Sequence, residues 1–188
     1  MRARRIGDEF SLVSATPPAK LAVILALADS RDSVAELGTA TGWTSISLAL
    51  AQPDRRVVTY DPIDRPLRHA YMGLVSPEVE ARIEYVTAPG ASDPRPVDML
   101  YIDSTHDRAD TIREFEAWQP MLRDGAVVVF DDYSHPEFPG VKEAVMQLGL
   151  DGLEQEGLFV HRVTRPSPGP MGDSAGIVEG HHSITLTT

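Results

Sequence analysis

Short, nearly continuous apolar runs alternate along the chain with segments whose apolar residues recur at helical spacing. The short runs predict strands that are buried on both faces, and they cover residues 34–37, 56–61, 84–87, 97–103 and 126–130. The segments between them predict helices over residues 20–28, 43–51, 66–74, 77–83, 104–119 and 141–148. This alternation indicates an α/β fold in which helices cover both faces of a mostly parallel sheet.

Local signals mark the ends of two of these helices. Thr16 offers an N-cap for the first helix, just before two prolines. Ser104 and Asp107 form a candidate capping box for the helix that runs to about Gln119. Pro120 should end or kink that helix, because proline lacks the backbone N–H group that a helix interior needs.

The two ends of the chain are less regular. Residues 1–15 lack a clear period and predict an N-terminal arm or lid, whereas 158–163 and 175–178 predict closing strands joined by a flexible Pro- and Gly-rich loop over 165–173. Because no helical segment separates these strands, we expect an antiparallel addition at one edge of the sheet. The sequence shows no internal repeat or linker, so we expect residues 1–188 to form one domain.

The composition is that of an acidic globular protein. Of the 188 residues, 42% are hydrophobic and 24% are charged, and the formal net charge is −11. This charge argues against a nucleic-acid partner, because phosphate binding needs a basic face. The chain contains no cysteine, as is common in a reducing compartment, and its apolar runs are too short to span a membrane. We therefore expect a cytoplasmic protein without a membrane anchor.

A glycine turn after the first strand is the clearest ligand-binding signal. Gly38 and Gly42 allow a sharp turn into a helix whose free N–H groups face a ligand. Their spacing differs from that of dinucleotide sites, which disfavours an NAD(P)-dependent oxidoreductase. Glu36 precedes the turn and suits a ligand that carries an amino group. Asp61 ends the next strand, where a carboxylate can accept the hydroxyl groups of a ribose.

Three aspartates also follow predicted strands, namely Asp103, Asp131 and Asp132. Adjacent parallel strands would bring these carboxylates together, where their repulsion would raise their pKa values unless a cation compensated. Such an oxygen-only ligand set favours Mg²⁺ before Zn²⁺. The alternative is that one aspartate caps a helix while the others face solvent. His106 and His135 each lie three residues beyond one of the aspartates and are candidate general bases.

In combination, these motifs resemble those of class I S-adenosylmethionine-dependent methyltransferases. The likeness is carried by residues 36–42, 97–106 and 122–133, and it covers roughly residues 20–150. The small O-methyltransferases that need a divalent metal are most similar, both the catechol type and the antibiotic-tailoring types that act on cephalosporins and macrolide sugars. The resemblance implies a Rossmann-like, doubly wound sheet of seven strands, with one antiparallel strand near the C-terminus.

The resemblance also implies roles for individual residues. The cofactor-binding residues would be Glu36, Gly38, Thr39, Gly42, Asp61, Gly90, Ala91, Ser92 and Asp103, with Gly90 to Ser92 near the adenine. The metal ligands would be Asp103, Asp131 and Asp132, although the catechol type has an asparagine where Asp132 stands. The catalytic residues would be His106 and Asp103. His106 occupies the position of the general-base lysine of the catechol type, so the base could be His106, His135 or Asp103.

These observations together predict a magnesium-dependent transfer of a methyl group from S-adenosylmethionine to a hydroxyl of a small molecule. Two alternatives remain open, a metal-independent methyltransferase and a non-catalytic cofactor-binding subunit. The acceptor cannot be deduced from the sequence. The roof of the site could come from residues 1–15, from the 165–173 loop, or from a second subunit of a homo-oligomer.

Overall fold

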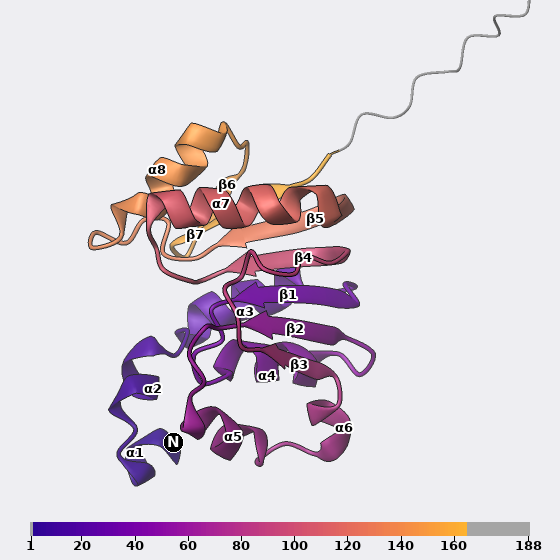
Figure 1. Ribbon diagram of the computed structural model, residues 1–188, viewed down its shortest axis with the longest axis vertical. Helices are drawn as coiled ribbons and strands as arrows, with labels where there is room; N and C mark the ends of the chain where they lie inside the picture. The colour runs from indigo at the N-terminus through magenta and orange to yellow at the C-terminus, as the bar shows by residue number, and fades with distance from the viewer. Residues whose placement is uncertain (1, 165–188) are drawn as a thin grey trace, which may run out of the picture.

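A computed structural model describes residues 2–164, which form an α/β fold around one seven-stranded sheet (Figure 1). The strand order is β3-β2-β1-β4-β5-β7-β6. The strands are β1 (Ser33–Leu37), β2 (Arg56–Tyr60), β3 (Ile83–Val86), β4 (Val97–Ile102), β5 (Leu122–Phe130), β6 (Leu153–Gln155) and β7 (Leu158–Arg162). The helices are α1 (Arg2–Ile6), α2 (Glu9–Ser14), α3 (Pro18–Leu27), α4 (Trp43–Ala51), α5 (Pro66–Met72), α6 (Pro77–Glu80), α7 (Arg108–Trp118) and α8 (Pro139–Leu148), with a 3₁₀ turn at Gln119–Met121.

The direction of the strands confirms the predicted sheet. Strands β1 to β5 pair in parallel, and β7 pairs antiparallel with both β5 and β6. The sheet also contains β6 at Leu153–Gln155, which the sequence pattern does not predict. Its three residues are all exposed, so an edge strand of this kind has no alternation of apolar and polar positions. The strand predicted at 175–178 and the loop at 165–173 lie outside the described residues.

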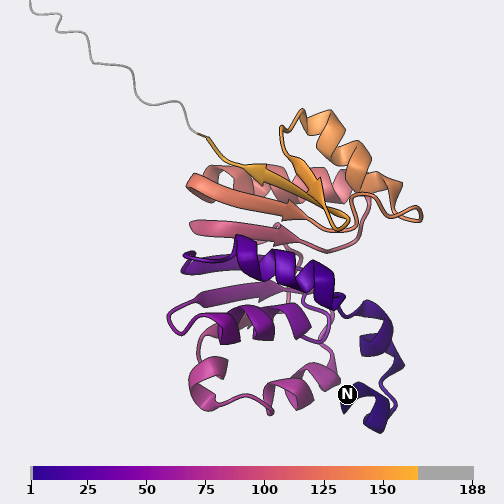
Figure 2. The same cartoon turned by 180° about the vertical axis from the view of Figure 1, so that it is seen from behind.

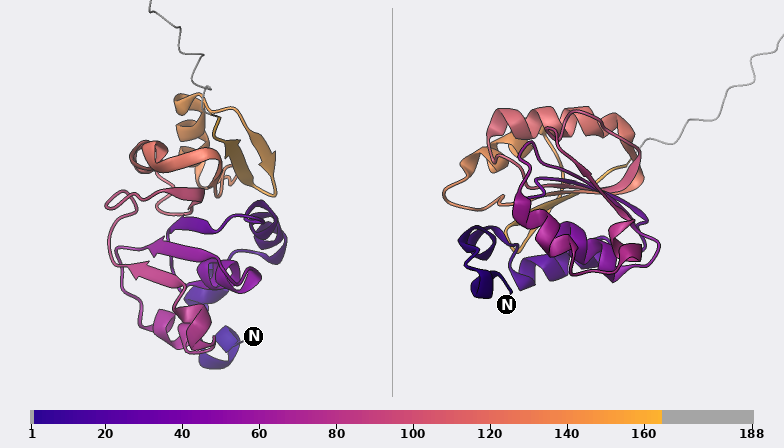
Figure 3. Two further views of the ribbon diagram at one scale, coloured as in Figure 1. Left: turned by 90° about the vertical axis from the view of Figure 1, so that its right-hand side faces the viewer. Right: turned by 60° about the horizontal axis from the view of Figure 1, so that its bottom comes forward.

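Helices cover both faces of the sheet (Figure 3), and alternate residues of the central strands pack into two separate cores. In β4, Leu100 and Ile102 face α7 and α8, whereas Met99 and Tyr101 face α3, α4 and α5. The same alternation divides β1 and β5, because successive side chains of a strand point to opposite faces. A side chain two residues beyond Tyr101, and those at the matching register of the neighbouring strands, therefore point toward the α3 side of the sheet.

Two predicted helix caps are wrong. Thr16 does not cap α3, because that helix starts at Pro18, which has no N–H group to satisfy; the Thr16 hydroxyl instead bonds the Thr44 hydroxyl at 2.9 Å. Asp107, rather than Ser104, is the N-cap of α7. Its carboxylate accepts the backbone N–H group of Ala109 at 2.8 Å, so the loop extends three residues further than the capping-box pattern indicates.

The fifth strand also starts earlier than the apolar run predicts. It begins at Leu122, so Asp124 and Gly125 lie within the strand and not in a turn. Gly125 has a φ of +75°, and the pairing with β4 shifts register between Val97 and Met99. This irregularity marks a bulge, which allows two polar residues inside an otherwise apolar strand.

The N-terminal segment folds into the two short helices α1 and α2, which lie beside the sheet near α5 (Figure 2). Asp8 caps α2 and accepts the hydroxyl of Tyr71 at 2.6 Å. The Arg65 guanidinium lies 4.1 Å from the centre of the Phe10 ring. We call residues 2–15 the arm, and these contacts hold it across the end of the sheet that carries the loops described below.

The fold predicts that a substitution of Trp118 strongly lowers the free energy of unfolding. This side chain is fully buried, packs edge-on against Tyr60, and donates to the carbonyl of Gly90 at 2.7 Å. Trp118→Phe should lower the free energy of unfolding by about 1–3 kcal/mol, because the Gly90 carbonyl loses its buried partner. Urea denaturation followed by circular dichroism measures this change. In Trp43→Phe, where the ring is half exposed, the loss should stay below about 1 kcal/mol, and equal losses would contradict this account.

Candidate functional site

The loops at the carboxyl ends of β2, β1, β4 and β5 meet at one edge of the sheet (Figure 1). Glu36 shares the face of Val34, Asp103 that of Tyr101, and Asp131 that of Val129. These side chains therefore point toward the α3 side of the sheet, because the two-residue period continues to the strand ends. The alternation of side chains along the strands thus brings these three residues to one face of the sheet, without any contribution from loop conformation.

The glycine turn lies directly against the end of β4. Gly38 has a φ of +105°, and a Cβ atom there would lie 1.8 Å from the carbonyl oxygen of Asp103. Gly42 is the N-cap of α4 with a φ of +86°, and a Cβ atom there would lie 2.8 Å from the Tyr85 hydroxyl. Both positions therefore require glycine, for reasons of conformation and of space. The turn is thereby held in contact with the loop that carries the aspartates.

A small cavity lies between this turn and the arm. It is lined by Ser14, Ala15, Thr16, Glu36, Gly38, Thr39, Ala40, Thr41, Trp43, Thr44 and Asp103. Its volume is about 20 Å³, enough for roughly one water molecule. Ser11 bonds Thr41 at 2.8 Å and Trp43 donates to the carbonyl of Thr16 at 3.3 Å. The arm therefore roofs the turn on one side of this cavity.

Glu36 is the buried acid of this cavity. Its side chain is 2% exposed and accepts the hydroxyl of Thr59 at 2.6 Å. Burial raises the pKa of Glu36 to about 8, while the Thr59 hydrogen bond partly opposes the shift. Glu36 is thus mostly neutral at pH 7 and would ionise if a cationic group entered the cavity.

The other predicted cofactor residues do not line this cavity. Asp61 accepts the N–H group of Ala40 at 2.9 Å and pairs with the buried Arg68 at 3.2 Å. Gly90 packs against Leu37 and Glu114, on the α7 side of the sheet. Ala91 and Ser92 continue that loop. In this arrangement the structure brings together Glu36, the glycine turn and, through Ala40, the predicted ribose residue Asp61, and it places Gly90 on the α7 side of the sheet.

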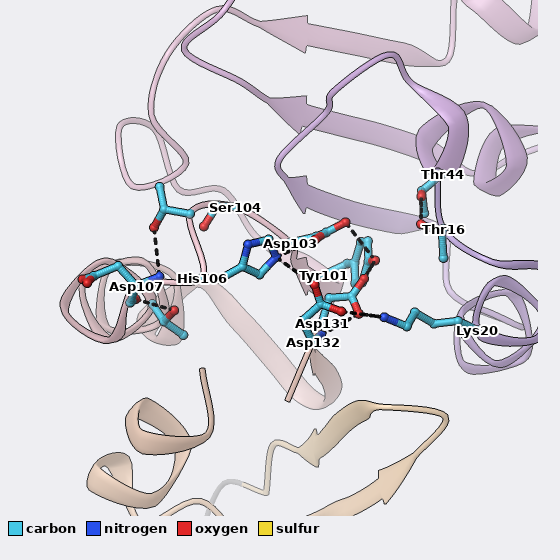
Figure 4. Close-up of polar contacts among 12 residues, drawn as sticks. Thr16, Lys20, Thr44, Tyr101, Asp103, Ser104, His106, Asp107, Asp131 and Asp132 are labelled. Carbon is cyan, nitrogen blue, oxygen red and sulfur yellow. Dashed lines mark hydrogen bonds and ion pairs between the residues drawn. The ribbon is translucent and has the colours of Figure 1, made fainter. Parts of the chain in front are cut away.

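The three aspartates and His106 gather next to the turn, together with Lys20 and Tyr101 (Figure 4). The Lys20 Nζ atom donates to Oδ1 of Asp131 and, at 2.9 Å, to Oδ1 of Asp132. The Tyr101 hydroxyl donates to Oδ2 of Asp131 and, at 3.2 Å, to Oδ2 of Asp103. We call Asp103, Asp131 and Asp132 the acid cluster.

His106 contacts the acid cluster from the side opposite Lys20 (Figure 4). Its Nε2 atom lies 3.2 Å from Oδ1 of Asp103 and 3.4 Å from Oδ2 of Asp132. Its ring stacks on Phe138 at 4.5 Å between centroids, and Phe138 also stacks on His135 at 4.6 Å. The Nδ1 atom of His135 accepts a hydrogen bond from the backbone N–H group of Glu137. Of the two histidines among the candidate bases, His106 is therefore the one that contacts the acid cluster.

The backbone around this site is strained at three non-glycine residues. Ala40, His106 and Asp132 have φ values of +47°, +59° and +53°. Such left-handed conformations are costly for residues with a Cβ atom, and they concentrate where a side chain must be held in place. The Asp132 N–H group donates to Oδ1 of Asp131 at 2.6 Å, which helps to hold this turn.

Burial and mutual charge shift the pKa values of the cluster. Burial raises the pKa of Asp103 to about 6, although its hydrogen bond with His106 opposes the shift. Burial alone would lower the pKa of His106, but Asp103 and the other two aspartates raise it above the usual value. For Lys20, burial is likewise outweighed by Asp131 and Asp132, so its pKa is raised. Both cations are thus stabilised by the carboxylates that they contact.

The acid cluster does not fit a magnesium ion while Lys20 lies on it. Ligand atoms of Asp103, His106 and Asp132 lie within 4.8 Å of one another, but this set includes a nitrogen and leaves out Asp131. Magnesium prefers six oxygen ligands in octahedral geometry. The oxygens of Asp131 already accept from Lys20, Tyr101 and the Asp132 backbone. The three predicted aspartate ligands therefore lie together, but hydrogen-bond donors of the protein already occupy their carboxylate oxygens.

Lys20 and Tyr101 are the residues of this site that sequence reasoning missed. Lys20 is the one charged residue in the apolar helix α3, and it stands four positions after Thr16 in the roof of the cavity. A single charge in an otherwise apolar helix was the available signal, because burying it requires a partner. Tyr101 precedes Asp103 by two residues and so shares its face of β4.

Comparisons with known proteins were made for sequence and for structure. The profile of a family described as a methyltransferase domain matches residues 35–133, which is more than half of the chain. A comparison with curated protein sequences found no match. Among residues 2–164, no helix is long and apolar enough to cross a membrane.

Solved structures with the same fold include an O-methyltransferase from Bacillus cereus in complex with S-adenosylhomocysteine, with 17% identity and a TM-score of 0.69, covering 87% of this chain and 89% of that one. TomG from Streptomyces achromogenes, an O-methyltransferase of tomaymycin synthesis in complex with S-adenosylmethionine, has 23% identity and a TM-score of 0.67, with coverage of 87% and 88%. A Burkholderia thailandensis N1-methyltransferase has 13% identity and a TM-score of 0.64, with coverage of 87% and 85%. At these identities the likeness establishes the fold.

The buried Glu36 predicts a characteristic dependence of stability on pH. Its pKa is about 8 in the folded chain and near 4.5 when exposed, so between these values the unfolded chain releases a proton that the folded chain keeps. Glu36 therefore lowers stability as pH rises, and Glu36→Gln should raise the free energy of unfolding at pH 8 by about 1–3 kcal/mol. Near pH 4 the variant and the original chain should be equally stable.

Urea denaturation at several pH values checks this expectation. The matched control is Glu116→Gln, on the exposed side of α7, which should show no such pH-dependent gain. A Glu36→Gln variant that is less stable than the original chain at pH 8 would show that the buried carboxylate is stabilising.

Proposed function

The chain belongs to the methyltransferase domain family, and we propose that it transfers the methyl group of S-adenosylmethionine to a hydroxyl group of a small molecule. One observation carries this proposal. Glu36 and the glycine turn line the same cavity as Asp103, and Asp103 bonds His106. A site for the amino-acid end of a cofactor thus adjoins a base with its carboxylate partner.

The cofactor end of the site offers partners for both charges of an amino acid. The Glu36 carboxylate would accept hydrogen bonds from the ammonium group of the methionine part. The free N–H groups at the start of α4 would donate hydrogen bonds to the carboxylate of the same methionine part. Gly38, Thr39 and Gly42 would bring the backbone close to the ligand. Asp61, for the ribose, and Gly90 to Ser92, near the adenine, complete the proposed set.

The chemistry would lie at His106 and Asp103. S-adenosylmethionine supplies a methyl group on a positively charged sulfur. His106 would take the proton of the acceptor hydroxyl at Nε2, and Asp103 would hold the imidazole in position and stabilise its charged form. Removal of that proton makes the oxygen a better nucleophile, and alignment in the closed site adds to the rate.

Two points support oxygen as the acceptor atom and a small molecule as the acceptor. The proteins from B. cereus and S. achromogenes are both described as O-methyltransferases, although the B. thailandensis protein of the same fold is an N1-methyltransferase. A hydroxyl needs a base more than a neutral amine does, and the His106–Asp103 pair offers one. The net charge of −11 further favours an acceptor other than nucleic acid, and the lack of cysteine favours a cytoplasmic location.

The magnesium requirement stays a prediction of the family resemblance and is not part of this proposal. Lys20 lies on Asp131 and Asp132, so the proton transfer proposed above relies on His106 and Asp103 alone. A homo-oligomer also stays a prediction, although the arm of the same chain already supplies one roof.

Calorimetry with S-adenosylhomocysteine tests the cofactor part of the proposal. We expect binding in the micromolar range, with nearly one proton released at pH 7, because the incoming ammonium group ionises Glu36. Affinity should therefore rise from pH 6 to pH 8. Glu36→Gln should abolish the proton release and weaken binding by about 10- to 100-fold, as expected for a lost charge-assisted hydrogen bond. Glu116→Gln should bind as the original chain does.

Titrations with NADH and with added Mg²⁺ serve as comparisons. Binding of NADH in place of S-adenosylhomocysteine would refute the proposal in favour of an oxidoreductase. Binding of S-adenosylhomocysteine without methyl transfer to any acceptor in a panel of phenols, catechols and sugar nucleotides would favour the non-catalytic subunit.

With an acceptor in hand, the pH dependence of methyl transfer tests the base. The rate should rise with pH and level off above the pKa of His106, which the aspartates hold above its usual value. Asp103→Asn removes the main carboxylate partner and should move this inflection to lower pH, whereas His106→Gln should lower kcat by about 100-fold or more. An unchanged pH profile in both variants would assign the proton transfer to another group.

A further inference from the structure

Lys20 is the one charged side chain of α3, and it reaches the acid cluster across the face of the sheet (Figure 4). Its Nζ atom contacts Oδ1 of both Asp131 and Asp132, and its side chain is 14% exposed. An ammonium group loses much of its hydration at such a position and requires close anionic partners in return. The position of Lys20 therefore depends on these two carboxylates.

The donors around the cluster occupy the oxygens that a metal ion would need. At Asp131, Oδ1 accepts from Lys20 and from the Asp132 N–H group, and Oδ2 accepts from Tyr101. At Asp132, Oδ1 accepts from Lys20, and Oδ2 faces His106. Oδ1 of Asp103 also faces His106, and its Oδ2 accepts from Tyr101. Every carboxylate oxygen of the acid cluster thus has a partner from the chain itself.

The charges of the cluster are balanced in the same way. Three carboxylates at one point would repel one another strongly, and this repulsion is the usual reason to expect a bound divalent cation. Here Lys20 contributes one positive charge on one side, and His106 can contribute a second on the other. A metal ion placed among these oxygens would have to displace Lys20 or lie beside its like charge.

We infer that Lys20 is the resident cation of the acid cluster, so that its ammonium group excludes a divalent metal ion and orients Asp131 and Asp132 beside the catalytic pair. Lys20 is thus a positioning residue, because it acts on the acceptor through the aspartates and His106. The role in methyl transfer rests on the proposed function, whereas the competition with a metal ion concerns the cluster alone.

Titration with Mn²⁺, followed by electron paramagnetic resonance of the free ion, tests the competition directly. The variant Lys20→Met keeps the apolar stem and removes the charge, and it should bind Mn²⁺ at least about tenfold more tightly than the original chain, since a like charge leaves the site. Lys20→Arg keeps the charge and should bind as weakly as the original chain. Lys142→Met, at the other lysine of the sequence, is the matched control and should change nothing.

Equal affinity of the original chain and Lys20→Met for Mn²⁺ would overturn the inference, because the ion and the ammonium group would then not compete. Absence of Mn²⁺ binding to both the original chain and Lys20→Met would also overturn the inference, since Lys20 would then not occupy a cation site. Thermal unfolding of each variant establishes that it is folded before titration.

A second measurement needs no variant at the cluster. Lys20 and Lys142 are the two lysines of the chain, so a protein labelled with carbon-13 at the lysine Cε atoms should give two lysine resonances, which Lys142→Met assigns. Millimolar Mg²⁺ should leave the Lys20 resonance unchanged. A saturable shift of that resonance, as the ammonium group leaves the aspartates, would overturn the inference.

Binding of S-adenosylhomocysteine to the same samples separates this inference from the proposed function. A chain that binds no S-adenosylhomocysteine fails the proposed function, and the Mn²⁺ comparison still decides whether Lys20 excludes a metal ion. If the original chain binds S-adenosylhomocysteine and also binds Mn²⁺ as tightly as Lys20→Met does, the proposed function stands and the inference about Lys20 is wrong.

Discussion

The contact between the turn at Gly38 and the carbonyl of Asp103 is the constraint on which the rest of the site depends. Because no Cβ atom fits at Gly38, the loops after β1 and β4 approach more closely than two ordinary loops could. This approach places the cavity with Glu36 beside the pair Asp103 and His106. The proposed sites of cofactor binding and of proton transfer are thereby brought together by backbone packing.

Much of this arrangement could be predicted from the sequence, because it follows from the two-residue period of buried strands. The apolar runs locate β1, β2, β4 and β5, and residues that end such runs must lie at one edge of a parallel sheet. The clustering of Asp103, Asp131 and Asp132 is a consequence of that geometry. The role assigned to Asp61 follows from its place at the end of β2, whereas the role assigned to Gly90 through a family resemblance depends on a loop conformation, which no periodicity determines.

The features that could not be predicted share a physical cause, which is that they depend on partners far away in the chain. The contact of Lys20 with Asp131 spans most of the sequence, and the apolar helix α3 indicates that Lys20 needs a partner but not which residue provides it. Likewise, β6 is exposed, and it forms because β7 offers it an edge. Of the two failed caps, Thr16 bonds the hydroxyl of Thr44, far along the chain, and Ser104 bonds the side chain of Glu114 inside α7 instead of the backbone at the start of that helix.

The roof over the cavity consists of two short helices held by few polar contacts, among them those of Asp8 with Tyr71 and of Ser11 with Thr41. Segments with so little buried contact open at a small cost in free energy, independently of global unfolding. The apparent affinity for any ligand of this cavity is then the intrinsic affinity multiplied by the fraction of open molecules. Substitutions in the arm can therefore tune how fast and how tightly the cavity is filled while leaving every residue of the reaction untouched.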